Sequence, residues 1–238
     1  LDDIDNIIFD LGMVVIDLDM DATTKAFKSL FGDSYDESMS ELNKHLHFEN
    51  YETGQISTAQ FIDGIQALLG QVGKRDRISA AWNAMLMTIP DRRFRILKAA
   101  QQEFRTFCLS NTNELHIDFI YDYLKREKQI ADLSDYFEKV YLSHEIKMRK
   151  PNAEIFEFVI DQNKLDPKRT LFIDDTAGHL EGAKELGIQI YHLQAPEKLE
   201  EILGHLASWQ SSTNTRAVDF GCKKAMRWRA SIALCMLF

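Results

Sequence analysis

Residues 4–16 read Ile-Asp-Asn-Ile-Ile-Phe-Asp-Leu-Gly-Met-Val-Val-Ile, in which a short apolar run stops at an aspartate and a glycine. A run of this length is typical of a strand buried in a parallel sheet. Asp10 would then lie at the tip of that strand, and Gly12 would lie in the turn that follows. The stretch predicts an α/β protein whose first strand ends in a candidate functional carboxylate.

Similar apolar segments recur along the chain, and helical patterns alternate with them. The predicted strands cover residues 4–9, 106–110, 139–143, 170–173 and 188–193. The predicted helices cover residues 91–104, 113–127, 151–163, 177–186 and 196–208. Pro151 and Pro196 are placed in first helical turns, and Gly187 is placed just after a helix end. Such alternation predicts a parallel sheet that is covered by helices on both faces.

One region interrupts this alternation directly after the first strand. Only helical stretches are predicted there, at residues 21–31, 35–50, 57–69 and 75–88. Ser57, followed three residues later by Gln60, resembles a capping box. We therefore expect a helical insertion over residues 17–89, within a core formed by residues 1–16 and 90–208.

The C-terminal stretch differs in charge from the rest of the chain. It contains five basic residues and one acid, namely Arg216, Lys223, Lys224, Arg227, Arg229 and Asp219. We expect residues 209–238 to form a basic, poorly ordered tail, because chain ends are commonly disordered. The alternative is a basic amphipathic segment that anchors the protein or binds a partner.

The overall composition excludes several classes of protein. The chain has 238 residues, of which 45% are hydrophobic and 27% charged, as in ordinary globular proteins. Its formal net charge of −9 argues against general nucleic-acid binding through a basic face. No run approaches the 18 apolar residues of a membrane helix, and the acidic start is the wrong sign for a secretory signal. We expect no membrane partner.

The cysteines and histidines indicate neither disulfides nor a zinc site. The cysteines, Cys108, Cys222 and Cys235, are odd in number and widely spaced. This usage favours a reducing cytoplasm. No metal-ligand spacing is found among the histidines, which are His45, His47, His116, His144, His179, His192 and His205.

Polar residues follow four of the predicted strands, where open parallel sheets bind their ligands. Asp10 at the first strand end is a candidate nucleophile, because aspartate forms acyl-phosphates in some phosphoryl-transfer enzymes. Its alternative role is to cap the next turn. Ser110 and Asn111 follow the second strand, and their side chains can donate hydrogen bonds to phosphate oxygens. Thr112 or Asn113 would also serve as a helix N-cap.

The other two strand ends carry a lysine and a pair of acids. Lys150 precedes a proline, where the chain is extended, and its ammonium would neutralise a nucleophile and a bound phosphate. Lys147 and Arg149 fit a solvated basic loop better. Asp174 and Asp175 end a buried strand and would repel each other without a cation. Magnesium, which prefers oxygen ligands, is the candidate cation, and a helix N-cap is the alternative role.

In their order along the chain, these four motifs resemble the haloacid dehalogenase-like hydrolase superfamily. The resemblance covers about residues 1–208 and implies a Rossmann-like α/β core. It also implies that the insertion at residues 17–89 is a small helical cap that closes over the active site. In that superfamily the first aspartate attacks phosphate, a serine or threonine and a lysine bind it, and an acidic pair holds Mg²⁺.

Within the superfamily, the chain looks most like the bacterial α-D-glucose-1-phosphate phosphatase branch. The matching segments are residues 10–12, 15–19, 54–57, 110–113, 148–151 and 174–175. The resemblance implies that Asp10 is both the nucleophile and a magnesium ligand. The Gly12 carbonyl, Asp174 and Asp175 would complete the metal site. The phosphate contacts would be Ser110, Asn111 and Lys150.

Gly12 departs from the commonest pattern of the superfamily. Many of its phosphatases carry a second aspartate two residues after the nucleophile, which acts as the general acid and base. The glucose-1-phosphate branch shares the glycine. Asp17, Asp19 or a side chain of the cap are then the remaining candidates for proton transfer.

The predicted function is magnesium-dependent hydrolysis of a small phosphomonoester, a sugar phosphate, through an aspartyl-phosphate on Asp10. The partner would be a small phosphorylated metabolite. Haloacid dehalogenation is an alternative that needs no metal, so the Asp174-Asp175 pair speaks against it. A ligand-binding or partner-binding protein of the same fold is the other alternative, because Gly12 leaves the acid–base role unfilled.

Overall fold

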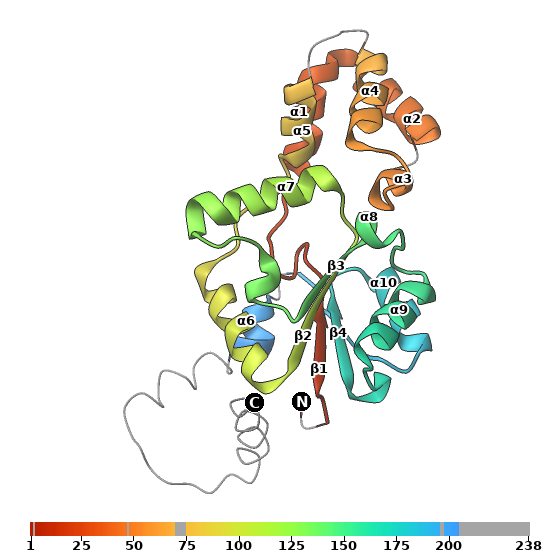
Figure 1. Ribbon diagram of the computed structural model, residues 1–238. Coiled ribbons are helices and arrows are strands. Elements are labelled where there is room, and N and C mark those ends of the chain that lie inside the picture. The colour runs from red at the N-terminus through yellow and green to blue at the C-terminus, as the bar shows by residue number, and fades with distance from the viewer. Residues whose placement is uncertain (2, 47, 70–74, 196–197, 205–238) are drawn as a thin grey trace, which may run out of the picture. The chain divides into compact units, whose positions relative to one another are not determined.

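A five-stranded parallel sheet lies at the centre of the computed structural model, which describes all residues except 2, 47, 70–74, 196–197 and 205–238. The strands are β1 (Asn6–Phe9), β2 (Arg105–Ser110), β3 (Lys139–Leu142), β4 (Thr170–Asp174) and β5 (Gln189–His192). Their order across the sheet is β3-β2-β1-β4-β5 (Figure 1). Phe9 pairs with Cys108 on one side and Ile173 on the other. The ends of β1, β2 and β4 therefore meet at one edge.

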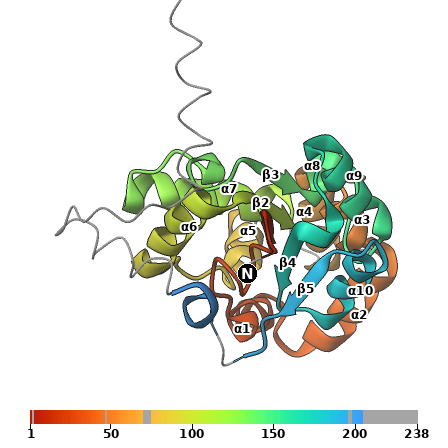
Figure 2. The ribbon, with the colours of Figure 1, turned by 90° about the horizontal axis from the view of Figure 1, so that it is seen from below.

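Helices cover both faces of this sheet. α6 (Asp91–Glu103), α7 (Glu114–Tyr123) and the helical residues 199–204 pack on one face. α9 (Ala153–Asn163) and α10 (Ala177–Glu185) pack on the other (Figure 2). Ile7 and Phe9 of β1 contact the first set, whereas Ile8 contacts the second, because successive side chains of a strand point to opposite faces. The predicted α/β fold is confirmed.

Short turns of helix complete the core. They are α8 (Ser143–Ile146), the 3₁₀ turns Leu133–Asp135 and Pro167–Arg169, and the π-helical turn Leu124–Lys128, which continues α7. Gly187 follows α10 with a φ of 81°, as its predicted place after a helix end requires. The prediction for Pro151 was wrong. α9 begins at Ala153, because a turn closed by the bond from Asn152 N–H to the Arg149 carbonyl precedes it.

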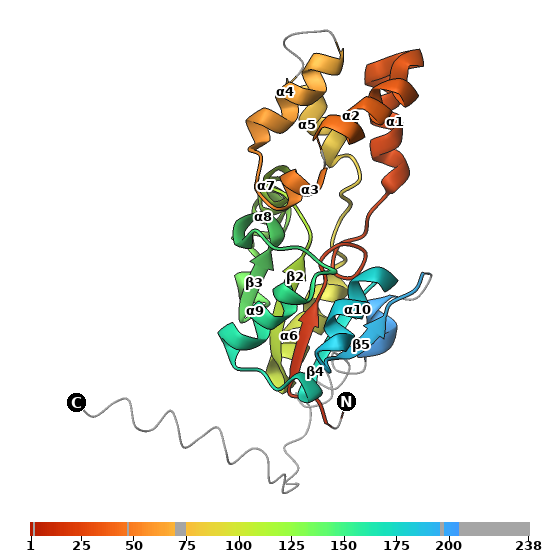
Figure 3. The same cartoon turned by 90° about the vertical axis from the view of Figure 1, so that its right-hand side faces the viewer.

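The described residues of the insertion after β1 form five helices with a hydrophobic cluster of their own, and we call these helices the cap (Figure 3). They are α1 (Met20–Phe31), α2 (Tyr35–Leu46), α3 (Phe48–Glu52), α4 (Thr58–Leu69) and α5 (Arg75–Asn83), with a 3₁₀ turn at Gly32–Ser34. The predicted capping box is present, since the Ser57 N–H donates to Gln60 Oε1 and the Gln60 N–H to Ser57 Oγ. The stacked rings of Tyr51 and Phe61, 4.2 Å apart, lie in the cluster.

Two linkers join the cap to the core, and they pair with each other. Leu18 forms an antiparallel bridge with Leu86, and the flanking Asp19 N–H and Met87 N–H donate to carbonyls of the opposite linker. The helix predicted to run to residue 88 therefore ends at Asn83, because the residues after it bond to the first linker instead. The buried guanidinium of Arg93 donates to the Val15 carbonyl at 2.9 Å and holds this linker against α6.

Core and cap helices belong to one compact unit, Leu1–Ala207. The whole of the predicted basic tail, residues 209–238, lies outside the described residues, as does Pro196. Within the described part of the chain, no helix combines the length and the apolar character needed to cross a membrane.

Two glycines of α10 provide a matched test of how tightly this helix packs. A Cβ at Gly182 would collide with the Pro151 carbonyl oxygen and would lie 3.1 Å from the Phe156 ring, whereas one at Gly178 would meet nothing within 4 Å. We expect Gly182→Ala to lower the free energy of unfolding by about 1–3 kcal/mol. Gly178→Ala should raise it by about 0.5–1 kcal/mol through helix propensity. Urea denaturation measures both, and equal effects would contradict the packing argument.

Candidate active site

Three carboxylates and one ammonium meet where β1 and β4 end. Asp10 follows β1, and its N–H donates to the Ile173 carbonyl of β4, which places it beside Asp174. The Lys150 Nζ donates to Asp10 Oδ1 at 2.6 Å and to Asp174 Oδ2 at 2.7 Å. Lys150 and Asp174 are wholly buried, and Asp10 is 6% exposed. The structure therefore brings together three side chains that the sequence predicted at three separate strand ends.

Burial and charge set the protonation of these groups. Burial raises the pKa of Asp10 to about 6, although the Lys150 ammonium opposes the shift. Burial would also raise the pKa of Asp174, but hydrogen bonds from His179 and Lys150 hold it below its usual value. Burial and the neighbouring Asp174 raise the pKa of Asp175. The cluster thus contains more negative charge than one lysine can neutralise.

This cluster suits a hard divalent cation. Oxygen atoms of Asp10, Asp174 and Asp175 lie within 4.8 Å of one another. Oxygen donors of this kind, with few protein carboxylates, are what Mg²⁺ selects. The donor set and the excess negative charge therefore fit the predicted magnesium site. The Gly12 carbonyl, the fourth predicted ligand, accepts a hydrogen bond from the Val14 N–H at 2.6 Å.

The residues at the end of β2 and directly after it differ in the contacts that their side chains make. Ser110 is buried and lines a pocket next to Gly12. The Asn111 carboxamide is bonded to the main chain of Lys150, donating to its carbonyl and accepting from its N–H, both at 2.9 Å. Asn113 is the N-cap of α7, since its Oδ1 accepts from the His116 N–H at 3.1 Å. Asn111 is therefore engaged with Lys150, a contact that the sequence did not predict.

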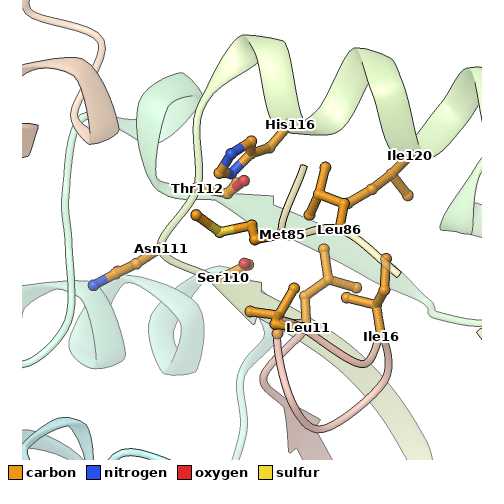
Figure 4. Close-up of a pocket in the computed structure, with 11 residues that line it drawn as sticks. Leu11, Ile16, Met85, Leu86, Ser110, Asn111, Thr112, His116 and Ile120 are labelled. Carbon is orange, nitrogen blue, oxygen red and sulfur yellow. The ribbon is translucent and has the colours of Figure 1, made fainter. Parts of the chain in front are cut away.

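A pocket of about 50 Å³ lies between this edge and the linkers of the cap (Figure 4). Its walls are mostly apolar and are formed by Leu11, Gly12, Ile16, Leu18, Met85, Leu86, Ser110, Asn111, Thr112, His116 and Ile120. Among these lining residues, only His116 has a titratable side chain. A Cβ at Gly12 would lie 3.0 Å from Leu18 Cδ1, so an apolar side chain fills the space beside this glycine.

Asp17 and Asp19, which the sequence offers as candidates for proton transfer, both bind other groups. Asp17 pairs with Arg93 at 3.3 Å and with Lys198 at 3.1 Å. Asp19 caps α1, where its side chain accepts from the Ala22 N–H. Each carboxylate is thus used to hold a linker or a helix end.

Polar contacts hold the cap against the loops that follow β2 and β3. Arg149 bonds to Glu49 at 2.9 Å and to Glu52 at 3.0 Å, both on α3. The prediction of a solvated Arg149 was wrong, because the cap supplies two carboxylates that the local sequence does not reveal. Ser143 donates to the Glu52 carbonyl at 2.5 Å and accepts from the Thr112 N–H at 2.9 Å.

A second junction joins α5 of the cap to α7 of the core. The Trp82 indole N–H donates to Asn113 Oδ1 at 3.2 Å. The His116 ring stacks on Trp82, with centroids 5.3 Å apart, and its Nε2 lies 3.3 Å from the Trp82 carbonyl. Burial lowers the pKa of His116 to about 4, so the ring is neutral at pH 7 and its Nε2–H is the donor. From the sequence, Asn113 was predicted only as a candidate helix N-cap, and no contact of Trp82 with His116 was predicted.

His179 is a further residue that sequence reasoning missed. Its Nδ1 lies 3.1 Å from Asp174 Oδ2 and 3.2 Å from Asp174 Oδ1. It stands in the first turn of α10, five residues after Asp174 and so just above the strand end. That spacing was the available signal, because the first turn of a helix that follows a strand lies over the strand tip.

Comparison with protein families gives one match over most of the chain. A family model described as haloacid dehalogenase-like hydrolase matches residues 7–192. The matched region includes all the side chains of the cluster and the whole cap.

Individual relatives agree with this match. A D-ribitol-5-phosphate phosphatase of Bacteroides thetaiotaomicron is 28% identical over 188 residues, which cover 79% of this chain and 91% of the relative. A solved haloacid dehalogenase (HAD) family enzyme from the same organism, in complex with magnesium and inorganic phosphate, is 35% identical, with a TM-score of 0.73. The match covers 84% of this chain and 98% of that enzyme. The solved structure of a predicted HAD-like family hydrolase from Porphyromonas gingivalis is 27% identical, with a TM-score of 0.72. The match covers 85% of this chain and 97% of that hydrolase.

Because burial depresses the pKa of His116 to about 4, this residue makes stability dependent on pH. Its unfolded pKa is 6.5, so the unfolded chain binds the proton more readily, and stability present above pH 6.5 is lost as the pH falls toward 4. We expect His116→Gln to reduce this loss by roughly 1–3 kcal/mol. Urea denaturation of both proteins at pH 7.5 and pH 5 measures the difference, and parallel pH dependences would contradict it.

Proposed function

The chain belongs to the haloacid dehalogenase-like hydrolases, and we propose that it is a magnesium-dependent phosphatase that hydrolyses a small phosphomonoester, a sugar phosphate. The observation that carries the proposal is the group of Asp10, Asp174 and Asp175 around the buried Lys150 ammonium. The relative named as a D-ribitol-5-phosphate phosphatase supports the choice of a phosphorylated sugar derivative. The related enzyme solved with magnesium and inorganic phosphate supports the cofactor.

Asp10 is the nucleophile of the proposed reaction. Its carboxylate oxygen forms a bond to phosphorus while the bond from phosphorus to the leaving oxygen breaks, which gives an aspartyl-phosphate. A water molecule then attacks phosphorus, the bond to Asp10 breaks, and inorganic phosphate leaves. Lys150 fixes the Asp10 carboxylate through the 2.6 Å hydrogen bond and offsets negative charge on the phosphate oxygens. Ser110 would donate its hydroxyl to one of those oxygens.

Magnesium would be held by Asp10, the Gly12 carbonyl, Asp174 and Asp175. Bound there, it would supply positive charge next to the phosphate oxygens, where charge neutralisation dominates phosphoryl transfer. His179 and Lys150 orient Asp174 from two sides through their hydrogen bonds. The carboxylate of Asp174 is thereby held in place independently of the cation.

Asp10→Asn tests the nucleophile. The amide has the same shape but is a poor nucleophile, so we expect kcat with 4-nitrophenyl phosphate to fall by about 10³-fold or more. Circular dichroism and urea denaturation should show a folded protein. Hydrolysis at the wild-type rate by the folded variant would refute the proposal.

Removal of metal tests the carboxylate cluster. A chelator should abolish phosphate release, Mg²⁺ should restore it, and Ca²⁺ should substitute poorly because its larger coordination shell disturbs in-line geometry. Asp175→Ala should weaken the activation by Mg²⁺ by about tenfold or more, since one charged ligand is lost. Full activity after exhaustive chelation would instead support the metal-independent dehalogenase chemistry.

The apolar surroundings of Gly12 lead to a prediction about leaving groups. A positioned general acid is typically worth about 10²–10⁴ in rate, and Leu18 fills the space beside Gly12 where one would act. Without an acid at residue 12, departure of the oxygen should favour a hemiacetal oxygen, as in a sugar 1-phosphate, over the ordinary alkoxide of a sugar 6-phosphate. The second step also lacks a base, so aspartyl-phosphate should accumulate when the first step is fast.

Rapid acid quenching with an aryl phosphate measures this accumulation. We expect a burst that approaches one equivalent per active site, and faster turnover of sugar 1-phosphates than of sugar 6-phosphates. Linear progress curves with equal rates for aryl and alkyl phosphates would show that another group supplies the proton.

A further inference from the structure

The carboxamide of Asn111 is committed to one residue. Its Nδ2 donates to the Lys150 carbonyl and its Oδ1 accepts from the Lys150 N–H, each at 2.9 Å. In Figure 4 this side chain points away from the side chains gathered around the pocket. Both ends of the carboxamide are thereby held against the main chain of Lys150, so the geometry favours a role in holding Lys150 over a role as a phosphate ligand.

The main chain of Lys150 lies in a segment without regular structure, so the hydrogen bonds with Asn111 are needed to fix it. It sits between α8 and α9, outside any strand or helix, so no ladder of hydrogen bonds fixes it. Its ammonium is nevertheless held at 2.6 Å from Asp10 and 2.7 Å from Asp174, with no exposed surface. Displacement of the reacting groups by about 1 Å can cost about 10²-fold in rate. The two hydrogen bonds between Asn111 and Lys150 tie this main chain to the residue that follows β2.

We infer that Asn111 is a positioning residue, which acts on the reaction through Lys150 and not as a phosphate ligand. This inference rests on the proposed function for its kinetic consequence. Asn111 joins the end of β2 to the segment that carries the lysine, while Lys150 itself joins the ends of β1 and β4. The strand ends that form the site are thereby linked through a single lysine.

A double-mutant cycle tests the inference, with Ser110→Ala as the neighbouring control. We expect Asn111→Ala to lower kcat for 4-nitrophenyl phosphate by about 10- to 100-fold, with a smaller change in KM. In a Lys150→Met background the same change should cost less than about threefold, because residues that act through one another are not additive. Ser110→Ala should cost a similar factor in both backgrounds. If Asn111→Ala lowers kcat by the same factor in the wild type and in the Lys150→Met background, Asn111 acts independently of Lys150 and the inference is overturned.

Chemical labelling of Lys150 provides a readout that does not depend on catalysis. Acetic anhydride followed by peptide mass spectrometry should find Lys150 protected in the wild type. Asn111→Ala should raise its labelling rate by about tenfold, and Ser110→Ala should change it by less than about twofold. Asn111→Asp keeps only the acceptor for the Lys150 N–H, so the labelling rate of Lys150 in this variant should lie between the rates in the wild type and in Asn111→Ala. Unchanged labelling in Asn111→Ala would overturn the inference.

The two measurements also separate this inference from the proposed function. An inactive wild type would refute the phosphatase proposal, and labelling would still decide whether Asn111 holds Lys150. If Lys150→Met falls below detection, the labelling comparison decides alone. Circular dichroism confirms that each variant is folded.

Discussion

The burial of one ammonium group between two carboxylates is the constraint that organises this protein. A charge without exposed surface is stable only when it is paired at close range, since burial of an unpaired charge costs several kcal/mol. Lys150 meets this condition with Asp10, which directly follows β1, and with Asp174, the last residue of the neighbouring strand β4. The pairing needs parallel strands whose carboxyl ends meet at one edge, and the strand order provides that arrangement.

The segment that carries the lysine must be held as firmly as the strands, although it has no regular structure. Contacts from three elements converge on it. Asn111 at the end of β2 bonds its main chain, Gly182 of α10 allows the Pro151 carbonyl to approach, and Arg149 bonds to α3 of the cap. Both the core and the cap therefore hold the segment that carries Lys150. The geometry of the site is thereby coupled to the docking of the cap.

Most of the fold and the central residues of the site could be predicted from the sequence, because both depend on local patterns. Apolar runs that end in polar residues identified the strands, and their parallel arrangement implied that Asp10, Asp174 and the Lys150 segment would meet. The contacts of Asn111 and Arg149 could not be predicted in this way. Each is a hydrogen bond to a distant segment, and the direction of a side chain across a loop has no local signal.

The pairing of the two cap linkers places Leu18 beside Gly12. Residues 10–18 follow β1 and form the first linker, so the stretch that begins with Asp10 also has to pair with the second linker. Leu18 forms that pair with Leu86 and at the same time fills the space beside Gly12. A Cβ at residue 12 would lie 3.0 Å from Leu18 Cδ1, so a larger side chain there would require the Leu18 side chain to move. The backbone pairing that attaches the cap thus also places an apolar side chain next to residue 12, two positions after Asp10.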